Sequence, residues 1–83
     1  MLTLLSPAQL IANLLQHASL SQRVAVLCRA KEANEKMLAK LTDFRMACIE
    51  QGWDDYWQAK HERTQETLAE IERALATCLP LYH

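Results

Sequence analysis

The sequence predicts an all-α fold in which two long antiparallel helices form a hairpin and a short amphipathic helix precedes them. Apolar residues recur at spacings of three and four over residues 21–51 and again over residues 54–78, the pattern of helices that bury one face. The single glycine of the chain, Gly52, lies between these segments. Because glycine readily adopts the left-handed conformation that ends many helices, we expect the chain to reverse direction there.

The first helix is expected over residues 7–17. Ser6 and Gln9 have the spacing of a capping box, and Pro7 occupies the first helical position, where its missing N–H costs nothing. One stripe of this helix is apolar: Leu10, Ile11, Leu14, Leu15 and Ala18. A helix of about three turns does not persist alone in water. We therefore expect it to pack on its own hairpin, giving a three-helix bundle, or on another chain, giving a dimeric helical bundle.

The second helix should follow an N-cap at Ser19 or Ser21 and run to Gln51, since no proline or glycine interrupts it. The residues of its 3-4 stripe are Leu20, Arg23, Leu27, Ala30, Asn34, Met37, Leu41, Phe44 and Cys48. This helix carries more basic side chains than the third, so we expect complementary charge between the two antiparallel neighbours.

The third helix should have Asp54 or Asp55 as its N-cap and should stop before Pro80. Its stripe consists of Trp57, His61, Thr64, Leu68, Ile71, Leu75 and Cys78. Folding the hairpin lays this stripe against that of the second helix, with Phe44 beside Trp57.

Length and composition limit the class of protein. Eighty-three residues make one domain, residues 1–83, with a thin core. A hydrophobic content of 51% is too high for a disordered chain, and polar residues interrupt the uncharged N-terminal stretch, which argues against a signal peptide or a membrane span. The net charge of −1 does not favour nucleic acid or an anionic membrane as a partner.

The cysteines argue against a disulfide framework and against a zinc site. Cys28, Cys48 and Cys78 are odd in number and include no C-x-x-C pair. We therefore expect a cytoplasmic protein without metal or cofactor. The hairpin brings Cys78 toward the helical turn that carries Cys28, and whether these two thiols are close enough to oxidise stays open. No phosphate loop, nucleophile elbow or catalytic triad is present, so we do not expect an enzyme.

Two surfaces are candidates for binding a partner. Trp53, Tyr56 and Trp57 share one helix face beside the turn, and such side chains are enriched among binding hot spots, although they could instead close the hairpin against Phe44. The other surface is the Leu-rich N-terminal segment, which could fit a partner's groove or close the bundle. Its candidate contact residues are Leu4, Leu5, Leu10, Ile11, Leu14 and Leu15.

These features favour a small cytosolic helical protein-interaction module. It would act as an adaptor, co-chaperone or inhibitor, bind a partner protein through apolar helix faces, and form a homodimer or a hetero-complex. The alternative is a small dimeric DNA-binding transcriptional regulator, because the short helix, the break and Gln22-Arg23 imitate a helix-turn-helix. In size and outline, the chain resembles the needle-subunit chaperones of type III secretion and phage-encoded inhibitors.

Overall fold

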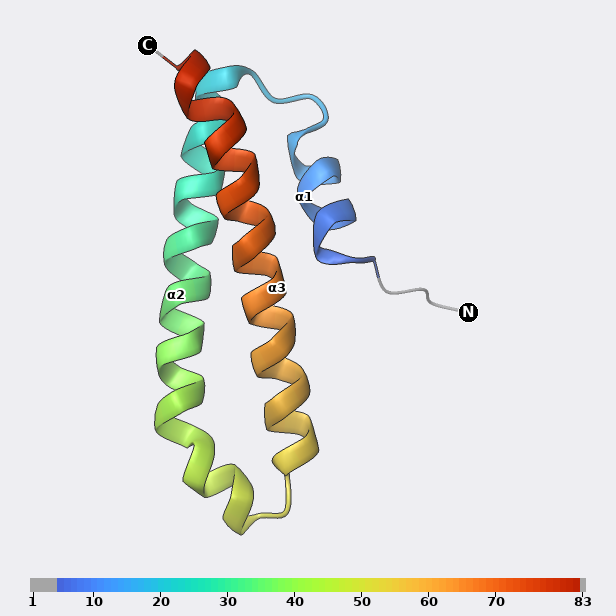
Figure 1. Cartoon of the computed structure of the whole chain (residues 1–83), viewed down its shortest axis with the longest axis vertical. Helices are drawn as coiled ribbons and strands as arrows, with labels where there is room; N and C mark the ends of the chain where they lie inside the picture. Colours follow the sequence, from blue (N-terminus) through green and yellow to red (C-terminus); the bar gives the residue numbers. More distant parts are fainter. Residues whose placement is uncertain (1–4, 83) are drawn as a thin grey trace.

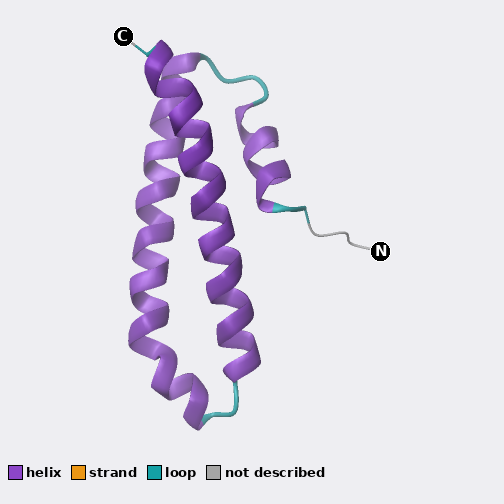
Figure 2. Cartoon of the chain, in the orientation of Figure 1, coloured by secondary structure: helices purple, strands orange, loops and turns teal. Residues whose placement is uncertain are grey.

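The computed structural model describes residues 5–82, and in this range the chain is helical, as predicted (Figures 1 and 2). The elements are α1 (Pro7–Leu15), α2 (Leu20–Glu50), α3 (Asp54–Cys78) and a final 3-10 turn, η1 (Leu79–Leu81). The long helices α2 and α3 form the antiparallel hairpin. The first helix ends two residues earlier than the sequence indicates, whereas the ends of the other helices agree within one residue.

Two capping boxes fix where the first two helices begin. The Ser6 hydroxyl accepts from the Gln9 amide at 3.2 Å, while the Ser6 amide donates to the Gln9 side chain at 2.9 Å. Ser19 and Gln22 repeat this arrangement at the start of α2, at 3.3 and 2.9 Å. Each box satisfies two amides that have no partner inside the helix. The choice between Ser19 and Ser21 is thus resolved in favour of Ser19.

The reversal at Gly52 has the hydrogen bonds of a Schellman motif. Gly52 has φ of 75°, its amide donates to the Ile49 carbonyl at 3.0 Å, and the Trp53 amide donates to the Cys48 carbonyl at 2.8 Å. The predicted N-cap of α3 is wrong, because Trp53 occupies that position and provides no side-chain bond. Asp54 and Asp55 lie in the first turn, where their charge suits the helix dipole.

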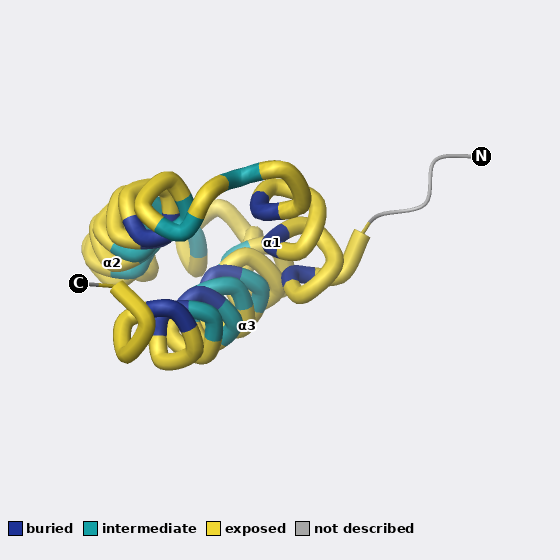
Figure 3. Tube along the Cα trace, turned by 90° about the horizontal axis from the view of Figure 1, so that it is seen from above, coloured by how far each residue is buried: buried dark blue, intermediate teal, exposed yellow. Residues whose placement is uncertain are grey.

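The hydrophobic core lies at the open end of the hairpin, opposite the turn (Figures 1 and 3). All three helices contribute to it, and Leu27 and Ile71 are its most completely buried side chains. The core residues are Ile11, Leu15, Val24, Leu27, Ile71, Leu75 and Cys78. The first helix therefore packs on its own hairpin. The Arg63 guanidinium strengthens this docking by donating to the Leu5 carbonyl at 2.6 Å.

The half of the hairpin near the turn is much less buried. Phe44, predicted to pack in the stripe beside Trp57, is 59% exposed, and Met37 is also exposed. The physical reason is the length of α1, which covers only the C-terminal half of α3 (Figure 1). The Cα trace measures 48 × 32 × 14 Å, so the molecule is a thin plate with large exposed faces. Within the described residues, no helix is long and apolar enough to cross a membrane.

Candidate functional site

Exposed apolar side chains gather at the turn of the hairpin. We define the turn patch as Ile49, Trp53 and Tyr56, all of which are exposed. Trp53 and Tyr56 are 57% and 65% exposed, and these two residues line a shallow hollow of about 390 Å³. Aromatic rings left in water at a helix end are a feature of binding surfaces, because they bury much area at little entropic cost.

Trp57 has a different role from its aromatic neighbours. It is half-buried, and its indole N–H donates to the Leu41 carbonyl of α2 at 2.6 Å. Its ring stacks on His61 with a centroid distance of 4.8 Å, and the Arg45 guanidinium lies 5.2 Å from the ring centroid. Trp57 therefore joins the two long helices, so Trp53 and Tyr56 are not needed to close the hairpin.

A second hollow, of about 490 Å³, lies along the flank of this stack. Its lining mixes acidic, basic, amide and apolar side chains: Arg45, Ile49, Asp54, Trp57, Gln58, His61, Glu62 and Gln65. Within residues 5–82, no group of three or more His, Cys, Asp or Glu side chains could hold a metal ion. The hollow thus offers a groove of mixed polarity beside the turn patch.

The N-terminal candidate residues separate into two groups. Ile11 and Leu15 are buried in the core, so they are not available to a partner while α1 stays docked. Leu14 is 65% exposed, and Leu5 and Leu10 are also exposed. Leu4 lies outside the described residues. Only the outward face of α1 therefore remains a candidate contact surface.

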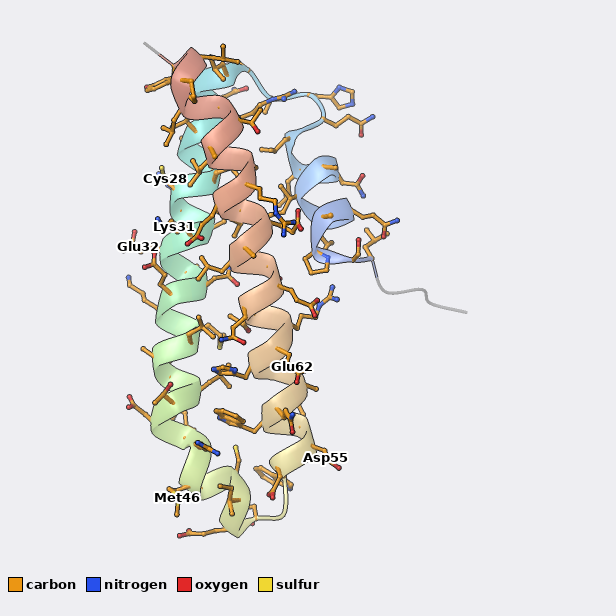
Figure 4. The ribbon with its side chains drawn as sticks, in the orientation of Figure 1. Cys28, Lys31, Glu32, Met46, Asp55 and Glu62 are labelled. Atoms are coloured by element: carbon orange, nitrogen blue, oxygen red, sulfur yellow. The ribbon has the colours of Figure 1, made fainter. Side chains whose placement is uncertain are left out.

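The cysteines lie in three different environments. Cys28 is exposed, Cys48 is half-buried and Cys78 is in the core, and all three are free thiols. Cys28 points away from the hairpin, on the outer side of α2 (Figure 4). The two residues considered for oxidation thus differ in exposure, and only Cys28 is accessible to an oxidant.

The acidic side chains near the turn have no cationic partners. Among the described residues, the ion pairs are Lys36–Glu32 and Arg73–Glu70, each within one helix. The expected charge pairing between α2 and α3 is therefore not found. Asp43 and Glu50 on α2 are exposed and unpaired, and so are Asp54 and Asp55 of α3.

Sequence reasoning missed one member of the turn patch, Ile49. It lies off the stripe that faces α3, and because α2 ends at Glu50 and the chain reverses at Gly52, helical spacing could not connect it with Trp53. Sequence reasoning also missed the contact of Trp57 with Arg45 and Leu41. Comparison of the chain with protein-family models, curated proteins and solved structures finds no significant match.

Proposed function

We propose that the chain is a non-catalytic protein-interaction module of the cytoplasm, an adaptor, co-chaperone or inhibitor, that binds a partner protein through the turn patch. One observation carries the proposal: Trp53 and Tyr56 are exposed side by side, although the hairpin is already closed by Trp57. Apolar side chains that contribute nothing to the core, yet gather at one end of a molecule, are best explained by a partner that covers them.

The outward face of α1 is a weaker candidate for the same role. Leu10 and Leu14 are one helical turn apart and exposed, so they could lie in a partner's groove. They lack the aromatic side chains that dominate binding energies at interfaces. We therefore assign the main contact to the turn patch and treat this face as the comparison surface in the experiment.

Co-purification of the tagged chain from its native cell, read by mass spectrometry, tests the proposal. Two matched double variants remove equal numbers of exposed residues from the two surfaces: Trp53→Ala with Tyr56→Ala, and Leu10→Ala with Leu14→Ala. We expect the first to lose the partner and the second to retain it. Retention by both variants, or loss only with the leucine variant, would refute binding through the turn patch.

The DNA-binding alternative remains a hypothesis without a specific observation in its favour. Arg23 is the basic residue closest to the start of α2, and its side chain donates to the Ala18 carbonyl at 3.0 Å. The helix that would enter a DNA groove has 31 residues, much longer than a recognition helix needs. Salt-dependent retardation of duplex DNA by the purified chain would support this alternative.

A further inference from the structure

A second apolar stripe runs along α2 and shares Ala30, Met37 and Phe44 with the stripe that was expected to face α3. Successive positions of this stripe are four and then three residues apart, as are the contact positions of a coiled coil. Every position is apolar except the one that Lys40 occupies. We call it the free stripe, and it consists of Val26, Ala30, Ala33, Met37, Phe44 and Ala47. All are exposed except Ala30, which is half-buried. Ala30 also packs against the hydrophobic core, whereas the described elements leave the other five side chains exposed.

Charged side chains border the free stripe in a regular order. Arg29, Lys36, Asp43 and Glu50 recur at intervals of seven residues, so they lie in one row along the same edge. The first two are basic and the last two are acidic, and all four are exposed. If an identical row runs antiparallel beside this one, the basic half of each row faces the acidic half of the other.

We propose that the free stripe binds the free stripe of a second copy, with the two α2 helices antiparallel. In this arrangement Arg29 lies opposite Glu50 of the other chain, and Lys36 lies opposite Asp43. The two pairs have the same sum of residue numbers, so one register satisfies both, and the two-fold symmetry forms each pair twice. Lys36 contacts Glu32 within its own helix in the single chain, but an exposed pair of this kind exchanges partners at little cost.

The apolar residues agree with this register. In an antiparallel coiled coil, each contact residue of one helix packs at the same level as a contact residue of the other helix. In this register Phe44 packs against Ala33 of the second copy, and Ala30 packs against Ala47. These two layers combine a large side chain with a small one, or two small ones, so the helices can approach closely there. Lys40 faces Met37 of the second copy and can extend its ammonium group to water.

This interface is distinct from the turn patch, and the inference therefore goes beyond the proposed function. It gives the thin plate the second layer of helices that small helical domains need to bury their apolar faces. Charge complementarity selects a second copy of the chain as the occupant, because the same row of four side chains supplies both halves of every pair.

A charge-swap cycle measured by sedimentation equilibrium tests the proposal. We expect the unmodified chain to dimerise, and Arg29→Glu or Glu50→Arg alone to raise the dissociation constant at least tenfold, because each places like charges opposite each other twice. The double variant Arg29→Glu with Glu50→Arg should return the dissociation constant to within about threefold of the original. Only an antiparallel pair allows this rescue, since two parallel helices in register would leave residues 29 and 50 about 30 Å apart along the axis.

Two controls separate the proposal from changes in folding. Glu35→Arg reverses an exposed charge on the opposite side of α2 and should leave the dissociation constant unchanged. Phe44→Ser removes an exposed side chain, so circular dichroism should stay the same while dimerisation weakens. A chain that stays monomeric at millimolar concentration, or a double variant that fails to recover, would overturn the proposal. A failure of the dimer proposal does not affect the co-purification test of the turn patch, because that test uses different residues. The failure of one proposal can therefore be distinguished from the failure of the other.

Discussion

At the residue scale, Gly52 is the position where the backbone itself imposes the residue type. Its φ of 75° is disfavoured for residues with a Cβ, and an added Cβ would have nothing within 4 Å. The cost of Gly52→Ala is therefore conformational strain without a clash, about 1 kcal/mol of unfolding free energy. Urea unfolding should show this loss, with a smaller one for Gly52→Asn, because asparagine tolerates this conformation. An alanine variant as stable as the original would contradict the assignment.

The two tryptophans give a second prediction at this scale. Trp57→Phe removes the indole N–H that donates to the Leu41 carbonyl and should lower the free energy of unfolding by about 1 kcal/mol. Trp53→Phe makes the same chemical change at an exposed site without a side-chain hydrogen bond. This variant should change the free energy of unfolding by less than about 0.5 kcal/mol. Chemical denaturation of the two variants provides the measurement, and equal losses would contradict the separate roles.

At the element scale, the docking of α1 is what converts a hairpin into a three-helix bundle. Ile11→Ala removes a side chain from the shared core and should cost about 2 kcal/mol of unfolding free energy. Leu14→Ala, one helical turn away on the exposed face, should cost less than about 0.5 kcal/mol. Urea unfolding of both variants measures the difference, and similar costs would mean that α1 does not dock in this orientation.

The same helix shows how far the sequence could be interpreted. Local rules were sufficient for the capping box at Ser6, the reversal at Gly52 and the three helices, because each depends on residues close in sequence. They were insufficient for the stripe of α1, since Leu10 and Leu14 are as apolar as Ile11. Which of these residues turn inward is decided by the position of α1 on α3, a contact between residues more than fifty positions apart.

The candidate site was less predictable than the fold for a related reason. Trp53, Tyr56 and Trp57 share one helix face in the sequence, but the distance to α2 decides which of them is buried. Phe44 shows the converse, because it keeps the spacing of a core residue where no third helix covers it. Periodicity identifies an apolar face, whereas its burial depends on the length of the neighbouring elements.

At the scale of the whole molecule, packing is unequal along the long axis. The core side chains from all three helices gather at the open end, whereas the half near the turn has only two helices (Figure 1) and few buried side chains. Local stability follows the number of buried apolar contacts, so opening need not involve the whole chain at once. The turn half should therefore be the part whose structure responds most to a bound partner.

Amide hydrogen exchange tests this inequality, at a concentration where the chain is monomeric. We expect amides near Leu27 and Ile71 to exchange only through global unfolding, because these side chains are the most deeply buried. Amides over residues 41–50 and 54–61 should exchange through partial openings, with protection at least tenfold lower. Ile11→Ala should then reduce protection near Leu27 and leave the turn half nearly unchanged, since that half already opens independently. Uniform protection along both long helices would show that the hairpin unfolds as one cooperative unit.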